Sequence, residues 1–325
     1  MTVVATGSIA FDYILSYSGR FRDHILMDKT HILNLSFLVE RLEKRRGGVA
    51  ANYAYNLSLL GYPSAILATA GHDAADYVDW LAARGIDISG LRLIDDVMTA
   101  TGFTTTDSED NQLTGYYGGA MLNADILGLE DTVRDPEVVI VGPNGPAAMA
   151  RLVRECRAGG VRWVYDPSHQ LSSMPVEDLS DGITGAWILI GNDYELELIQ
   201  SRTSWDMAAL TQRCAMVVTT KGRYGSLLTT RDGVIEVPAA PVQKEADPTG
   251  AGDAYRAGLL AGLLQGLTPR DAGHVGSLAS AYVVEQTGTV EHLYSRAEFA
   301  ARFAVAFDRP LPAELFAVRS AEVKR

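Results

Sequence analysis

The chain has 325 residues, of which 47% are apolar and 21% are charged, and this composition is typical of a soluble globular protein with a full core. Its 28 Lys and Arg against 40 Asp and Glu give a net charge of −12, which argues against a nucleic-acid binder because such proteins need a basic face. Two cysteines are too few for a disulfide framework or a cysteine-rich zinc site, and no apolar run reaches the ~20 residues of a membrane span.

Short apolar strands then alternate with helices along the chain. The predicted strands are, in order, residues 3–5, 11–17, 65–70, 101–106, 113–117, 137–141, 162–165, 187–190 and 216–219. The predicted helices are residues 49–60, 74–84, 146–158, 193–201, 205–214, 251–265, 269–286 and 295–307. This alternation favours one doubly wound α/β domain over residues 1–325, with a largely parallel sheet covered on both faces. Such sheets bind ligands beyond the carboxyl ends of their strands.

Two polar segments do not fit the alternation. Residues 11–46 are irregular after their first strand and end in a basic cluster at 41–46, which we interpret as a solvent-exposed loop. Residues 99–121 predict a polar two-stranded ribbon. We expect these two segments to form a small β lid on the main domain.

The most informative motif is Asp247-Pro-Thr-Gly250-Ala251-Gly252-Asp253, which leads directly into a predicted helix. Its small residues leave backbone N–H groups unobstructed and the helix start adds partial positive charge, so the segment predicts a cradle for a phosphate group. Asp253 inside that cradle is well placed to accept a proton from a hydroxyl. An Asp-rich helix cap with a glycine turn is the simpler alternative. The glycine spacing matches neither a dinucleotide-binding fingerprint nor a P-loop, so a dehydrogenase and a P-loop ATPase are both unsupported.

A second glycine motif, Gly47-Gly48-Val-Ala-Ala-Asn52, opens the first predicted helix. The glycine pair allows the backbone to approach a ligand closely, and the Asn52 amide offers both a donor and an acceptor. Taken alone, the same pattern is compatible with a glycine-rich helix start and a buried asparagine.

In this order and about 200 residues apart, the two motifs resemble the signatures of the ribokinase-like (pfkB) sugar and nucleoside kinases. Asn192-Asp-Tyr-Glu195 is similar to the N-x-x-E motif of that family. Residues 219–226 resemble its nucleotide-contacting strand and turn, and Ser8 with Asp12 resembles its clamp on substrate hydroxyls.

The resemblance implies phosphotransfer from ATP with Mg²⁺. It gives Asp253 the role of general base and the backbone of Gly250, Ala251 and Gly252 that of an anion hole. Its implied contacts are Asn192, Thr220 and Gly222 with ATP, and Asn192 and Glu195 with Mg²⁺ through water. Relatives also use a monovalent cation such as K⁺ near this loop, for which Asp247 is a candidate.

The sequence also offers candidate residues for binding the acceptor. Polar groups suited to ribose hydroxyls are Ser8, Asp12, Ser36, Gly48 and Asn52. Side chains of the predicted ribbon and its exit that would form a flat slot for a base are Phe103, Tyr116, Tyr117 and Met121. The stretches TGSIAFD, RGGVAAN and DPTGAGDAYRAG resemble the bacterial adenosine kinases. That resemblance implies adenosine as the acceptor at its 5′-hydroxyl, places His169 and Gln170 near the purine edge, and implies a homodimer formed through the lid.

Three alternatives stay open at this stage: a sugar kinase for ribose or a fructose-type acceptor, a nucleoside kinase of broader specificity, and a non-catalytic sensor that kept the fold. A sugar kinase would not need the aromatic slot, and a sensor would not need Asp253. Sparse cysteine usage and the lack of a basic region before the N-terminal apolar stretch predict a cytoplasmic protein without a signal peptide. We expect no membrane and no nucleic acid among its partners.

Overall fold

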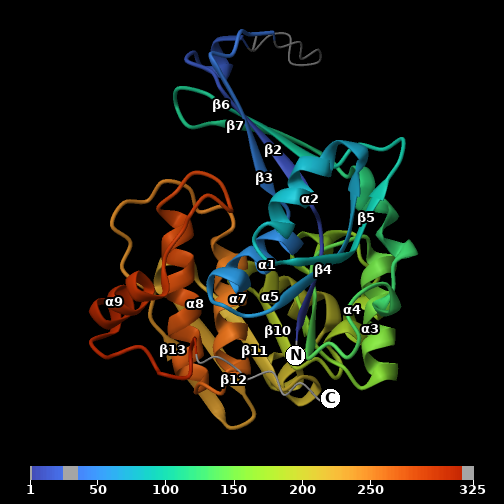
Figure 1. Ribbon diagram of the computed structural model, residues 1–325, viewed down its shortest axis with the longest axis vertical. Coiled ribbons are helices and arrows are strands. Elements are labelled where there is room, and N and C mark those ends of the chain that lie inside the picture. The colour runs from blue at the N-terminus through green and yellow to red at the C-terminus, as the bar shows by residue number, and fades with distance from the viewer. Residues whose placement is uncertain (1, 25–35, 317–325) are drawn as a thin grey trace.

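The computed structural model describes residues 2–24 and 36–316 and arranges their strands in two sheets (Figure 1). The large sheet has nine strands in the order β13-β12-β11-β10-β9-β8-β1-β4-β5. Its strands are β1 (Val3–Thr6), β4 (Ser64–Gly71), β5 (Asp87–Ile94), β8 (Val138–Val141), β9 (Arg162–Tyr165), β10 (Ile188–Asn192), β11 (Met216–Thr220), β12 (Ser226–Thr230) and β13 (Gly233–Val237). The small sheet has four strands in the order β3-β2-β6-β7: β2 (Ala10–Ser16), β3 (Arg41–Gly47), β6 (Ala100–Thr106) and β7 (Gln112–Tyr117).

Helices cover both faces of the large sheet, which confirms the predicted α/β class (Figure 1). The helices are α1 (Val49–Leu59), α2 (Ala75–Ala82), α3 (Pro146–Gly159), α4 (Val176–Ile183), α5 (Asp193–Thr203), α6 (Met207–Arg213), α7 (Ala251–Leu264), α8 (Pro269–Val284) and α9 (Arg296–Phe307). Neighbouring residues of one strand point to opposite faces: Ala5 packs in the cluster that contains α1, α7 and α8, whereas Val4 packs with α3 to α6. Strands buried on both faces read as continuous apolar runs, which is why the sequence predicted them. No helix among the described residues is long and apolar enough to cross a bilayer.

The order of the large sheet reverses between β1 and β8. From β1 the sheet continues through β4 to β5, and from β8 it continues the other way through β9, β10 and β11. All of these pairs are parallel, so the carboxyl ends meet at one edge. The point of reversal is where open α/β sheets form a ligand crevice. Here Ser8 follows β1, and the Asn144 amide beyond β8 donates to the Gly7 carbonyl at 3.4 Å.

The small sheet projects from the body of the molecule beyond that edge (Figure 1). It corrects our interpretation of residues 41–46 as a loop, because they lie in strand β3, which pairs antiparallel with β2. The strand lacks an apolar alternation because its long basic side chains lie over aromatic rings. The Lys44 ammonium is 3.6 Å from the centre of the Phe11 ring, and the Arg46 guanidinium is 5.1 Å from Trp80. An edge strand tolerates such residues well.

Some helices and strands of the structure were not predicted from the sequence. The predicted ribbon of two strands is part of the four-stranded small sheet, and β5, α4 and the β12–β13 hairpin were not predicted. β5 and β13 are the outermost strands of the large sheet and are partly exposed, so they mix polar with apolar residues. Their pattern is therefore weaker than that of the central strands.

Candidate active site

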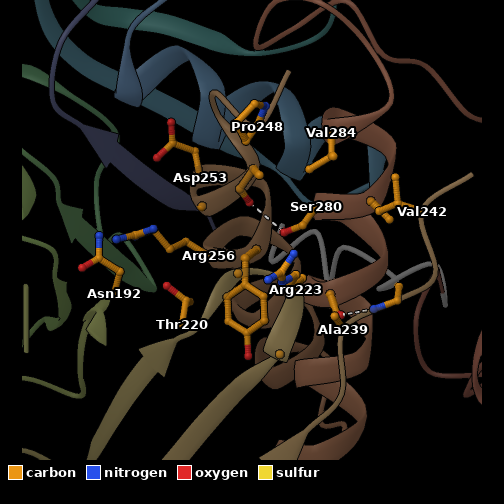
Figure 2. A pocket seen from close by; sticks show the side chains of 18 of the residues that line it. Asn192, Thr220, Arg223, Ala239, Val242, Pro248, Asp253, Arg256, Ser280 and Val284 are labelled. Carbon is orange, nitrogen blue, oxygen red and sulfur yellow. Dashed lines mark hydrogen bonds between the residues drawn. The ribbon is translucent and has the colours of Figure 1, made fainter. Parts of the chain in front are cut away.

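A cavity of about 770 Å³ opens at the carboxyl edge of the large sheet, beside the start of α7 (Figure 2). Its lining runs from Pro143 to Val284, so it brings together residues that are up to 141 positions apart in the sequence. The predicted site residues that line it are Asn192, Glu195, Thr220, Gly222, Ala251, Gly252 and Asp253. Gly250 caps α7 directly before them.

The start of α7 requires glycine at two positions. Gly250 has φ +82°, and a Cβ placed on it would lie 2.8 Å from the Thr289 Cβ. A Cβ on Gly252 would lie 2.6 Å from Nη1 of Arg256. The first N–H groups of a helix have no carbonyl partner within the helix, so a helix start can receive an anion. Here the Ala251 N–H donates to the Pro248 carbonyl at 3.1 Å, and the N–H groups of Gly252 and Asp253 follow it.

Asp253 lies in the first turn of α7, and its Oδ2 accepts a hydrogen bond of 2.8 Å from Nδ2 of Asn52. Burial raises the pKa of Asp253 to about 6, although the Arg256 charge and the Asn52 hydrogen bond act in the opposite direction. Oδ1 of Asn52 is buried and has no hydrogen-bond partner among the described residues. The pair therefore presents a carboxylate suited to proton transfer beside an unused acceptor atom that a ligand hydroxyl could satisfy.

Asn192 and Glu195 form a capping box at the start of α5. Oδ1 of Asn192 accepts from the Glu195 N–H at 2.7 Å, and Oε2 of Glu195 accepts from the Asn192 N–H at 2.8 Å. The Ser168 hydroxyl donates to Oε1 of Glu195 at 3.3 Å. Both side chains thus have a structural task as well as a place at the cavity wall.

The donor set around the cavity fits a magnesium ion that keeps its waters. Within the part of the chain that is described, no three His, Cys, Asp or Glu side chains converge as direct protein ligands of a metal would. Instead, Asn192 and Glu195 line the same cavity as the start of α7, where a phosphate group could bind. Mg²⁺ usually retains several waters and takes the rest of its ligands from one or two carboxylates and substrate phosphates.

Sequence reasoning missed a buried assembly around Asp166. Nη2 of Arg256 donates to Oδ1 of Asp166 at 3.0 Å, and Nε lies 2.6 Å from Oδ2 without the alignment of a hydrogen bond. The Tyr53 hydroxyl donates to Oδ2 of Asp166 as well. A signal was available, because Asp166 directly follows the buried strand β9 and so lies at the ligand edge.

The residues expected around the acceptor gather where the small sheet meets α1. Burial and, to a smaller extent, the Asp247 carboxylate together raise the pKa of Asp12 to about 6. Strand register places Asp12, Gly102 and Tyr116 in one row and hence on one face of the small sheet. The Tyr116 hydroxyl lies 3.7 Å from the sulfur of Met121.

Gly48 lies where the β1–β2 connection packs against the start of α1. It has φ +96°, and a Cβ there would lie 2.5 Å from both the Ala10 nitrogen and the Ser8 carbonyl oxygen. The Ser8 hydroxyl accepts from the Val49 N–H at 3.2 Å. The glycine therefore allows the β1–β2 connection to pack directly on the first turn of α1, which carries Asn52.

Three expected acceptor residues lie elsewhere: Phe103, Tyr117 and Ser36. The register places Tyr117, like Phe103, on the face of the small sheet opposite Asp12. Phe103 pairs with Tyr13 and stacks on it with ring centres 5.2 Å apart, so it occupies the face of the small sheet opposite Asp12. Ser36 is exposed and adjoins Phe37, whose ring packs 4.6 Å from Tyr17. Tyr17 lies about 16 Å along the strand from Asp12 at ~3.3 Å per residue. Phe103 is separated from Asp12 because neighbouring side chains of a strand point to opposite faces. Ser36 is separated from Asp12 because it lies near the far end of β2.

The other predicted residues lie at the same edge of the sheet. His169 and Gln170 belong to the short 3₁₀ helix Ser168–Ser172, and the ring Nε2 of His169 is 3.4 Å from Nε2 of Gln170. Burial lowers the pKa of His169, against the effect of nearby carboxylates, so its imidazole is mostly neutral at pH 7. The Thr220 hydroxyl donates to the Gly191 carbonyl at 3.5 Å. Asp247 accepts from the backbone N–H groups of Thr249 and Gly288, and its part in cation binding stays a prediction.

Comparison with known proteins identifies relatives over nearly the whole chain. Residues 12–295 match the family described as pfkB family carbohydrate kinase. The chain is 31% identical to a nucleoside kinase of Methanothermobacter thermautotrophicus over 305 residues, which is 93% of this chain and 95% of that protein.

Solved structures give the same result for the fold. The nucleoside kinase of Burkholderia thailandensis in complex with inosine superimposes with a TM-score of 0.85 at 35% identity, covering 95% of this chain and 99% of that one. The nucleoside kinase of Methanocaldococcus jannaschii, an archaeal member of the ribokinase family, gives 0.85 at 27% identity over 94% of this chain and 98% of its own.

Proposed function

Because the chain belongs to the pfkB family of carbohydrate kinases, we propose that it transfers the γ-phosphoryl group of ATP to the 5′-hydroxyl of adenosine, giving AMP and ADP. The observation that carries the proposal is the 2.8 Å hydrogen bond between Asn52 and Asp253. This bond joins α1, the helix that follows the glycine pair, to the Asp253 carboxylate at the start of α7. A second hydroxyl of the acceptor that donates to the unsatisfied Oδ1 of Asn52 would therefore hold the reacting hydroxyl beside both the base and the transferring group.

In the proposed reaction Asp253 accepts the hydroxyl proton while the acceptor oxygen attacks the γ-phosphorus. The backbone N–H groups of Gly250, Ala251 and Gly252 stabilise the negative charge on the phosphoryl oxygens. Mg²⁺, when bound, neutralises charge on the donor phosphates, and the chain would hold its waters through Asn192 and Glu195.

The nucleotide donor would occupy the cavity itself. Thr220 and Gly222 lie at its wall on β11 and the turn that follows, so they are the proposed contacts with ATP together with Asn192. A volume of about 770 Å³ falls in the usual range for the site of a small ligand.

The nucleoside would lie between the small sheet and α1. Ser8, Asp12 and Asn52 supply polar groups for the ribose, while Tyr116 and Met121 supply an apolar surface for the base. In this proposal the small sheet acts as a lid, and residues His169 and Gln170 face the purine edge. Adenosine is favoured over other nucleosides by the sequence resemblance to adenosine kinases. The nucleoside class is also supported by the relatives in the two comparisons.

The first experiment is an ADP-release assay with Mg-ATP and a panel of acceptors: adenosine, inosine, guanosine, cytidine, ribose and fructose 6-phosphate. We expect adenosine to give the highest kcat/KM. Another nucleoside in first place would correct the acceptor and keep the class. A sugar in first place would favour the sugar-kinase alternative, and no turnover with any acceptor would favour the non-catalytic sensor.

The two faces of the small sheet provide a matched test of the base slot. We expect Tyr116→Ala to raise KM for the nucleoside by about tenfold, because a ring that packs against a base contributes ~1–3 kcal/mol. Phe103→Ala removes an equally exposed aromatic ring from the opposite face, and we expect it to leave KM unchanged. Equal effects of both substitutions on KM would contradict the placement of the base beside Tyr116.

A further inference from the structure

We propose that Arg256 is a catalytic residue of the phosphoryl transfer, and that its Nη1 donates a hydrogen bond to the γ-phosphoryl group of bound ATP while Asp166 holds the rest of the guanidinium. The inference rests on the proposed phosphotransfer from ATP. It does not depend on which acceptor is used.

The geometry of α7 brings the guanidinium to the anion cradle. Arg256 follows Asp253 by three positions, so both side chains lie on one face of the helix and both line the cavity. The separation of 2.6 Å between Nη1 and a Cβ placed on Gly252 means that the guanidinium packs directly against the last glycine of the cradle. In Figure 2 the side chain extends from α7 toward Asn192 and passes below Asp253.

The other nitrogens of Arg256 are fixed by carboxylates. Nε and Nη2 face the two oxygens of Asp166 at 2.6 and 3.0 Å, and Nη2 lies 3.9 Å from Oε2 of Glu195. None of these contacts, all within the described residues, involves Nη1. The planar guanidinium is therefore held in one orientation, with Nη1 on its cradle side.

The guanidinium keeps its charge in this setting. Burial acts to lower the pKa of Arg256, but the Asp166 carboxylate and other nearby acids outweigh that effect and raise the pKa above its ordinary value. Arg256 is only 8% exposed and Asp166 only 1%. Both ions of a buried pair lose their hydration, so apolar residues of similar size often stabilise a fold more than the ion pair does. A charged pair at the wall of a cavity of about 770 Å³ is consistent with a role in binding a ligand.

The second arginine at the cavity wall is placed differently. Arg223 belongs to the turn after β11, is exposed, and donates from Nη2 to the Tyr224 hydroxyl at 3.1 Å. Figure 2 shows the Arg256 side chain below Asp253, whereas the Arg223 side chain lies farther to the right. Among the arginines that line the cavity, Arg256 is therefore the one beside the general base.

The proposed step conserves atoms and charge. The acceptor oxygen forms a bond to the γ-phosphorus, the bond to the bridging oxygen of ADP breaks, and the hydroxyl proton moves to Asp253. Arg256 stays protonated throughout and donates to an equatorial oxygen, where the negative charge of the transition state accumulates.

A purely structural ion pair makes a different prediction. If Arg256 only joined α7 to Asp166, its loss would lower stability and weaken the binding of every nucleotide to the same extent. A contact with the γ-phosphoryl group weakens a triphosphate and leaves a diphosphate unchanged.

The test is isothermal titration of the full chain with ADP and with the non-hydrolysable triphosphate AMP-PNP, both with Mg²⁺. In Arg256→Gln we expect the Kd of AMP-PNP to rise about tenfold to a hundredfold, as for the loss of a charge-assisted hydrogen bond, while the Kd of ADP changes less than about twofold. We expect turnover to fall by at least the same factor. The double variant Arg256→Gln/Asp166→Asn replaces the ion pair with a neutral pair, so that it folds without an unpaired buried charge, and it should show the same loss.

Arg151→Gln is the matched control. Arg151 also pairs with two carboxylates, Glu130 and Glu155, but it lies on α3 outside the cavity lining. Its loss should change neither Kd. An unchanged ratio of the two Kd values in both Arg256 variants would overturn the inference. If the wild-type chain phosphorylates no acceptor, the proposed function fails, and the ratio still decides the role of Arg256.

Discussion

Asp253 experiences opposing influences on its charge. Burial raises its pKa, whereas the Arg256 charge and the Asn52 hydrogen bond lower it, and the result is about 6. A carboxylate with this value is mostly ionised at neutral pH, yet it is a stronger base than an exposed aspartate. The neighbouring side chains therefore set the basicity of this residue as well as its position.

Asp253→Asn removes the base while keeping the size of the side chain. We expect kcat to fall by about 10² to 10⁴, because an amide cannot accept the hydroxyl proton. The affinity for ADP, measured by titration, should stay within about twofold of the wild type, since the cradle is made of backbone groups. Turnover at the wild-type rate would exclude general-base catalysis by this residue.

The activity should depend on pH in the acidic range. Below about pH 6 Asp253 is protonated and cannot act as a base, so kcat/KM should fall as the pH is lowered through that value. The pKa of Asp12 is also raised to about 6, so Asp12 takes up a second proton in the same pH range. We therefore expect log(kcat/KM) to fall by between one and two units per pH unit on the acidic side. The check is kcat/KM measured between about pH 5 and 9, and a flat profile down to the acid end would contradict it.

The Asp253 carboxylate should lower the stability of the fold at pH values where it is charged. Its folded pKa of about 6 lies above the ordinary 3.8, so the protonated form is the one that the fold favours. Its contribution to stability is complete below about pH 3.8 and is lost as the pH rises through about 6. Asp253→Asn should therefore melt above the wild type at about pH 8, with a difference that shrinks toward about pH 4. A lower melting temperature at about pH 8 would contradict the raised pKa.

At the scale of single elements, the first turns of α5 and α7 each combine a helix cap with a candidate binding function. The capping box of Asn192 and Glu195 satisfies backbone groups of α5 at the cavity wall. Gly250 caps α7 in a left-handed conformation, and Ala251, Gly252 and Asp253 of the first turn line the same cavity. A sequence pattern alone could not separate the two tasks, because the residues that begin a helix are also those that bind an anion.

Two glycines at the ends of α7 test the cradle. Gly250 and Gly266 have φ of +82° and +86°, but only Gly250 has a neighbour, Thr289, within contact distance of an added Cβ. We expect Gly266→Ala to lower the free energy of unfolding by about 1 kcal/mol and to leave kcat unchanged. Gly250→Ala should be more destabilising and should reduce kcat, because the clash with Thr289 shifts the start of the helix. Denaturant unfolding and the ADP-release assay measure the two effects, and equal kcat in both variants would contradict the cradle.

At the scale of the whole molecule, the small sheet leaves an apolar face uncovered. The register places Leu42, Phe103, Leu113 and Tyr117 on the face opposite Asp12, and each of them is at least 46% exposed. Apolar residues gathered on one face are typical of an interface between proteins. A second copy of the chain is the occupant that the proposed homodimer requires.

The dimer can be tested on one strand. We expect the wild-type chain to sediment as a dimer and Leu113→Glu to sediment as a folded monomer, because a charge on the apolar face would be buried without a partner. Thr114→Glu is the control, since Thr114 is the next residue of β7 and points to the other face. A wild-type monomer at micromolar concentration would contradict the dimer.

The sequence by itself determined the fold class and located the segment of the proposed cradle and of Asp253, the proposed base. These features are local: a buried strand is a run of neighbouring residues, and the cradle with Asp253 occupies seven consecutive positions. Tertiary structure alone decided the assembly of Tyr53, Asp166 and Arg256, the strand character of residues 41–47, and which face carries Phe103. Asp166 and Arg256 are 90 positions apart, and a strand that shifts by one residue reverses all its side chains. Such contacts depend on packing and register between distant segments, and no pattern within either segment encodes them.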